Sequence, residues 1–190
     1  MDASSILTTL LSTKSINGIS KATEASSSDV KSILANAVPV LLQGANKQTS
    51  GSTAASFTQA LADHATADTS NLTSFFKNVD LSDGSKILSH LLTASATKSI
   101  AKASNTTEST TKSVLSAAAP LFMSLLGQQT SGSSASAIGS LLSGLAGSSS
   151  VTSLLGGLLG GSSSSSSSSN GKTGKTGASG LVSGLMGLLK

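Results

Sequence analysis

The sequence predicts an all-α protein made of two copies of one helical unit, followed by a Ser/Gly-rich tail. Aromatic residues make up only 2% of the 190 residues, so a core must come from Leu, Ile, Val and Ala, which suits packed helices. Apolar residues recur at helical spacing along the first two thirds of the chain. The third observation is an internal repeat with a fixed offset.

A shift of 81 residues aligns residues 6–61 with residues 87–142 without a gap. The aligned positions share a proline, a Gln-Thr-Ser-Gly-Ser string and the apolar skeleton, which indicates a tandem duplication. We therefore divide the chain into unit 1 (1–79), unit 2 (80–147) and a tail (148–190). Because each unit is short and would expose an apolar helix alone, we expect both units to pack as one helical domain around their third helices.

The elements follow in the same order in each unit. One apolar face predicts a first helix in each unit; its positions are Ile6, Leu7, Leu10 and Leu11, and Ile87, Leu88, Leu91 and Leu92. A short second helix is predicted at 15–23 and at 96–104. The third begins near Ser26, where Ser26-x-x-Asp29 resembles a capping box, and its twin covers 107–126. A fourth helix follows the Gly-Ser breaks at 51–52 and 132–133.

Two further features complete the predicted units. Residues 71–79 have a weaker helical pattern, and residues 80–84 join the units, with Ser82 as the expected cap of the next helix. Pro39 and Pro120 lie inside the two third helices, where proline removes a hydrogen bond and costs ~3 kcal/mol. Their matching positions indicate a structural role, either a kink that the packing needs or a helix that ends at Val38 and restarts.

The tail is predicted to be disordered, because Ser/Gly low-complexity sequence has too little apolar surface to offset its chain entropy. It ends in GLVSGLMGLLK, residues 180–190, in which Leu181, Leu185, Leu188 and Leu189 are candidate interaction residues. Three partners are open to this segment: a groove on the body, another copy of the chain, or a membrane surface. We favour the first two, because two or three lysines attract anionic headgroups weakly.

The charge pattern bears on nucleic-acid binding. All twelve basic residues are Lys, and residues 1–147 have a net charge of only +1. The run from Ile100 to Leu115 resembles a helix-turn-helix, but the second helix offers one Lys per unit (Lys31, Lys112), and Glu108 would repel phosphate. We expect no sequence-specific DNA binding. Weak, non-specific nucleic-acid association through the tail lysines is the alternative function.

The sequence contains no catalytic pattern. Cysteine is absent, which fits a cytoplasmic location. Asp63, His64 and Asp68 suggest a metal site only loosely, and the DLSDG segment at 80–84 lacks the carboxylate that a calcium loop needs at its twelfth position, which is Leu91. We expect no enzymatic activity, metal, cofactor or small-molecule substrate.

The repeated Ile-x-x-x-Leu-Leu, Ile-x-Lys and Ala-x-Pro elements, with the LLGGLLGG segment at 154–161, resemble the YidB-like bacterial proteins, a domain of unknown function. The resemblance covers about residues 3–161. It implies homeodomain-like helical units and a bacterial, cytoplasmic origin. Such proteins often have Gly after the second short helix, where this chain has Glu24 and Asn105. The residue patterns and the resemblance both predict a non-catalytic structural or protein-interaction protein of unknown specific role.

Overall fold

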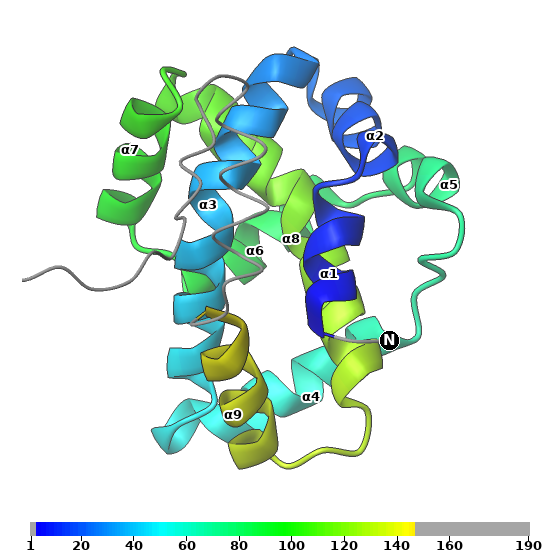
Figure 1. Cartoon of the computed structure of the whole chain (residues 1–190), viewed down its shortest axis with the longest axis vertical. Helices are drawn as coiled ribbons and strands as arrows, with labels where there is room; N and C mark the ends of the chain where they lie inside the picture. The colour runs from blue at the N-terminus through cyan, green and yellow to red at the C-terminus, as the bar shows by residue number, and fades with distance from the viewer. Residues whose placement is uncertain (1–2, 147–190) are drawn as a thin grey trace, which may run out of the picture.

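The computed structural model describes residues 3–146, and every regular element in that range is helical, which confirms the all-α prediction (Figure 1). The elements are α1 (Ala3–Leu10), α2 (Thr13–Thr23), α3 (Ser27–Gln48), the 3-10 turn η1 (Gly51–Thr53), α4 (Ala54–Ala65), α5 (Leu72–Lys77), α6 (Leu81–Leu91), α7 (Ala94–Ala103), α8 (Glu108–Thr130) and α9 (Ala135–Ala146). Helices α7, α8 and α9 each begin 81 residues after α2, α3 and α4. The helix boundaries thus recur with the offset of the sequence repeat. The homeodomain-like description of each unit stays a prediction.

Hydroxyl side chains begin the second and third helices of both units. At α3, Ser26 Oγ accepts the Asp29 N–H at 3.0 Å, and at α8, Thr107 Oγ1 accepts the Thr110 N–H at 3.0 Å. The same bond starts α2 at Ser12 and α7 at Thr93, each at 3.2 Å. These side chains satisfy backbone donors that the first turn leaves open, so the local sequence determines where these helices start.

The predicted cap at Ser82 is wrong. Asp80 caps α6 instead, because its Oδ1 accepts the Ser82 N–H at 2.8 Å and the Asp83 N–H at 3.3 Å. The helix therefore begins at Leu81, inside the segment expected to be a link between the units, and Gly84 lies buried within it. Aspartate is among the strongest N-caps, and here it precedes the serine by two residues.

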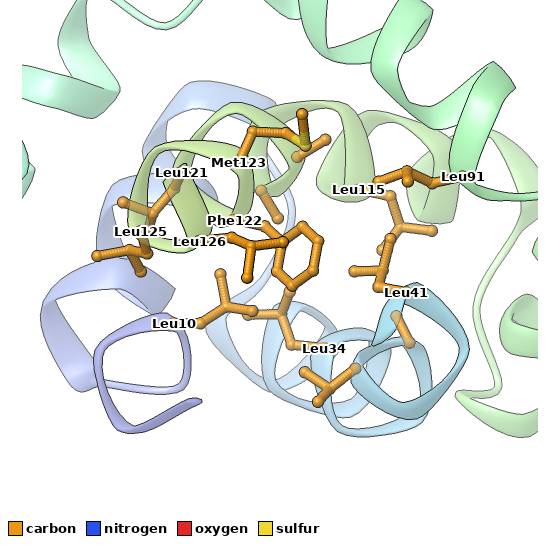
Figure 2. Close-up of a cluster of buried hydrophobic side chains, with 14 of the residues drawn as sticks. Leu10, Leu34, Leu41, Leu91, Leu115, Leu121, Phe122, Met123, Leu125 and Leu126 are labelled. Carbon is orange, nitrogen blue, oxygen red and sulfur yellow. The ribbon is translucent and has the colours of Figure 1, made fainter. Parts of the chain in front are cut away.

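Helices α3 and α8 form the centre of the molecule. In α8 every residue from Val114 to Gly127 is buried, as its apolar composition on all sides predicts. Figure 2 shows residues of both units meeting in one cluster around the ring of Phe122. Three pairs of equivalent positions lie in it: Leu10 and Leu91, Leu34 and Leu115, and Leu41 and Phe122. The two units share one core, as predicted.

The fourth helices cross between the units. Helix α4 of unit 1 packs against α8, and α9 of unit 2 packs against α3. The α4–α8 contact is so close that a Cβ atom on Gly127 would overlap the carbonyl oxygen of Leu61. A polar bridge also joins α3 to the end of α7, where Asn36 Nδ2 donates to Ser104 Oγ at 3.2 Å. Each unit therefore completes the packing of the other.

Both third helices continue through their prolines, so the alternative of a helix that ends at Val38 is wrong. Pro120 has no N–H to donate to the Ser116 carbonyl four residues earlier. That oxygen faces Gly84 of α6, where a Cβ atom would overlap it, so the Cα hydrogen of Gly84 points toward the oxygen instead. Such a Cα–H···O contact partly replaces the missing bond. Pro120 and Gly84 together let α6 lie close against α8.

Two turns contain non-glycine residues with left-handed backbone. Glu24 has φ 58° and Asn105 has φ 54°, and they occupy equivalent positions in the two units. After Asn105, the Thr106 N–H donates to the Ala101 carbonyl at 2.9 Å and the Asn105 N–H donates to the Lys102 carbonyl at 3.2 Å, which is a Schellman ending of α7.

Of the helices between residues 3 and 146, none has the length and apolar character needed to cross a bilayer.

Candidate interaction surfaces

A groove opens between α4 and α6 over α8. It encloses about 470 Å³, and its floor is apolar, with Phe57 from α4, Ile87 and Leu91 from α6, and Met123 from α8. Phe57, Leu91 and Met123 are buried beneath it, while Ile87 is half-buried. The crossing of α4 onto α8 sets α4 beside α6, so the groove exists only because the units pack together. We call it the α4–α6 groove.

The rim of the α4–α6 groove is polar and includes both histidines of the chain. His64 Nε2 lies 3.7 Å from Asp83 Oδ2, with side chains 23% and 41% exposed. His90 and Lys86 lie on the α6 side. The Gln48 side-chain amide donates to the His90 carbonyl at 2.7 Å and so ties the end of α3 to α6. The groove therefore has an apolar floor and a rim with charges of both signs.

A smaller polar hollow of about 340 Å³ continues beyond the His64–Asp83 pair. Asp68, Asp80 and Asp83 line it, and Asp63 lies on the rim of the groove, so four of the eight acids of the chain gather here. Two hydrogen bonds from Ser70, one from its side chain and one from its backbone, lower the pKa of Asp68 below its ordinary value. This region is the acidic side of the groove.

The loosely suggested metal site at Asp63, His64 and Asp68 does not form. Residues 3–146 contain no group of three or more His, Asp or Glu side chains arranged to hold a metal ion. Asp80 and Asp83 of the DLSDG segment instead serve as the cap of α6 and the partner of His64.

A second hollow, of about 530 Å³, lies between α2 and α5. Lys14, Lys21 and Lys77 line it, together with Asn17 and Thr73. We call it the α2–α5 hollow. Sequence reasoning missed it, because Lys77 lies far from the other two lysines along the chain. The weak helical pattern of residues 71–79 was the only available signal, and it did not reveal which helix α5 contacts.

The residues of α3 and α8 that a helix-turn-helix would use to contact DNA are only partly accessible. The first turn of α8 is exposed, but Glu108 Oε1 lies 4.0 Å from Lys98 Nζ, and the helix is buried from Val114 onward. Lys112 is exposed, and Lys31 is half-buried on α3. The surface that a recognition helix would present is thus confined to its first two turns.

The remaining candidates from the sequence fall into two groups. Pro39 and Pro120 lie within the central helices, as described above. The four tail residues lie outside the described range; they are Leu181, Leu185, Leu188 and Leu189.

Comparison with known proteins identifies the family of the chain. Curated proteins and solved structures include none that matches this chain. A family model described as bacterial protein of unknown function matches residues 5–129, which is well over half of the chain and spans the helices from α1 to most of α8. The chain belongs to this family, DUF937.

Proposed function

We propose that this is a non-catalytic interaction protein whose α4–α6 groove binds the apolar segment 180–190 of its own chain. The observation that supports this most directly is the apolar floor of the groove beside its acidic side. Helical grooves with apolar floors accept amphipathic helices through side chains spaced at i, i+4 and i+7. The proposal makes the protein a scaffold whose binding surface is covered or open according to the state of its tail.

The segment 180–190 complements the groove in its leucine spacing and in the sign of its charge. Leu181, Leu185, Leu188 and Leu189 have the i, i+4, i+7, i+8 spacing that places side chains on one face of a helix. The residues after 147 contain three Lys and no acid, and Lys190 lies within the segment; Asp63 and Asp83 line the groove, and Asp68 and Asp80 line the adjoining hollow. Eleven residues with this much Gly do not hold a helix alone in water, so the groove must supply the stabilising contact.

The length of chain beyond α9 permits this docking. Residues 147–179 span up to roughly 110 Å when fully extended. This is about three times the length of α8, which has 23 residues and is roughly 35 Å long. A tether of this kind gives an effective concentration in the millimolar range. Binding within one chain is therefore favoured over exchange between copies at micromolar protein concentration.

The test compares the full chain with Leu185→Asn and with the matched control Ser183→Asn, which changes the same segment off the leucine face. We expect Leu185→Asn, but not the control, to shift the methyl NMR signals of Ile87, Leu91 and Met123. It should also lower the thermal midpoint by a few degrees. Deleting 180–190 should reproduce the effect of Leu185→Asn.

Three results would contradict the proposal. The first is identical groove signals and stability in all variants. The second is co-flotation of the full chain with anionic vesicles, lost on deletion of 180–190, without any change at the groove. The third is a concentration-dependent dimer, seen in sedimentation, that disappears together with the groove shifts. The last result would assign the occupant to a second copy.

A further inference from the structure

The α2–α5 hollow concentrates positive charge on a nearly neutral body. Figure 1 shows α5 lying beside α2, at the N-terminal side of the molecule. Lys14 and Lys21 are seven residues apart on α2, so their Cα atoms are separated by about 10.5 Å along the helix axis. Lys77, at the end of α5, faces them across the hollow. None of the residues that line the hollow is acidic.

The three lysines of the hollow have no ion-pair or hydrogen-bond partner within residues 3–146. The ion pairs within residues 3–146 are His64–Asp83 and Lys98–Glu108, so Lys14, Lys21 and Lys77 are exposed and unpaired there. Asn17 Oδ1 accepts a hydrogen bond from Ser27 Oγ at 3.4 Å. This bond orients the amide and leaves its Nδ2 group for another acceptor. The hydroxyl of Thr73 lies on the α5 side.

The fold does not impose this arrangement, because unit 2 lacks it. The position equivalent to Lys14 is Ser95, which has no charge, and the position equivalent to Gly18 is Ser99. Gly18 matters because a Cβ atom there would overlap the ring of Phe76, so glycine lets α5 approach α2. In unit 2, Lys98 lies next to Glu108 instead. The lysine cluster therefore belongs to unit 1 and its α5 helix.

We propose that the α2–α5 hollow binds a compact anion with two or more phosphate groups. Ammonium groups bind phosphate as point charges. Three of them surround this one concave surface, which is more than a single phosphate group contacts at once. The two-turn separation of Lys14 and Lys21 favours a ligand that extends along α2. A nucleic-acid duplex is disfavoured, because the surrounding surface supplies few further cations and residues 1–147 have a net charge of +1. This site lies on different helices from the α4–α6 groove, so either proposal can fail alone.

The test measures the binding of inorganic tripolyphosphate to the full chain at low salt, by calorimetry and by amide NMR shifts. The variant Lys14→Gln/Lys21→Gln/Lys77→Gln should weaken binding at least tenfold. The matched control Lys98→Gln/Lys102→Gln/Lys112→Gln removes the same charge from exposed positions of unit 2 and should weaken binding less than twofold. Shifts should concentrate on α2 and α5. All six lysines are exposed, and the one ion pair that the control removes, Lys98–Glu108, is itself exposed and contributes little, so both variants should nearly keep the thermal midpoint of the parent chain.

Two further probes define the ligand class. Orthophosphate should bind the hollow at least fivefold more weakly than tripolyphosphate, since it reaches fewer ammonium groups. A single-stranded oligonucleotide should bind no more tightly than tripolyphosphate. The proposal is overturned by equal losses in the two triple variants, by the absence of saturable binding, or by oligonucleotide binding through Lys14, Lys21 and Lys77 that is tenfold tighter than that of tripolyphosphate.

Discussion

Glu24 and Asn105 are different residues that adopt the same left-handed backbone at equivalent positions of the two units. Both follow the second helix of their unit. For a residue with a side chain this conformation costs about 1–2 kcal/mol, although Asn tolerates it better than Glu. The resemblance to the YidB-like proteins, which often have glycine near this place, pointed to the turn. The identity of Glu24 alone gave no reason to expect left-handed backbone.

Replacing Glu24 with Gly should raise the free energy of unfolding by about 1 kcal/mol, because glycine adopts this backbone without strain. Asn105→Gly should give a smaller gain. Chemical denaturation of the full chain measures both effects. The control Glu24→Ala keeps the strain and should give no gain, so an equal gain from Gly and Ala would show that removal of the carboxylate, and not the backbone, is responsible.

The sequence predicted the first residues of the helices better than their last residues or the helices that they pack against. The starts at Ser26 and Thr107 were visible, because a hydroxyl residue precedes an apolar run in each case. Helix α8 instead runs to Thr130, four residues past the predicted end, because Gln128 and Gln129 are polar without being helix breakers. Gly84 was expected in a link, yet it lies inside α6, where it allows the close contact with Ser116.

Gly84→Ala should lower the free energy of unfolding by about 1–3 kcal/mol or more, because the added methyl meets the Ser116 backbone, which cannot move aside as a side chain would. Gly144 of α9 is the matched control. A Cβ atom there meets nothing within 4 Å, so Gly144→Ala should raise stability by about 1 kcal/mol through helix propensity. Denaturation curves of the two variants that shift in the same direction would contradict this account of the α6–α8 contact.

For the whole molecule, periodicity revealed which face of each helix is buried but not which helix buries it. Phe57 and Leu61 mark the apolar face of α4 in the sequence. Nothing in the local sequence, however, indicates that this face packs against α8 of the other unit. Both candidate surfaces depend on helix pairings of this kind. The α4–α6 groove joins residues as distant as Phe57 and Met123, and the α2–α5 hollow joins Lys14 to Lys77. The repeat and the helices were predictable, whereas the surfaces were not.

The two units form one domain because each fourth helix packs on the other unit. Helix α3 contacts α6, α7, α8 and α9, all of which belong to unit 2. Amide hydrogen exchange of residues 1–79 expressed alone, with the full chain as reference, shows whether unit 1 folds without unit 2. We predict that the amides of residues 30–45 exchange within about tenfold of the unfolded rate in the fragment and are strongly protected in the full chain. A fragment that sediments as a monomer and keeps full-chain protection over residues 30–45 would contradict this dependence of unit 1 on unit 2.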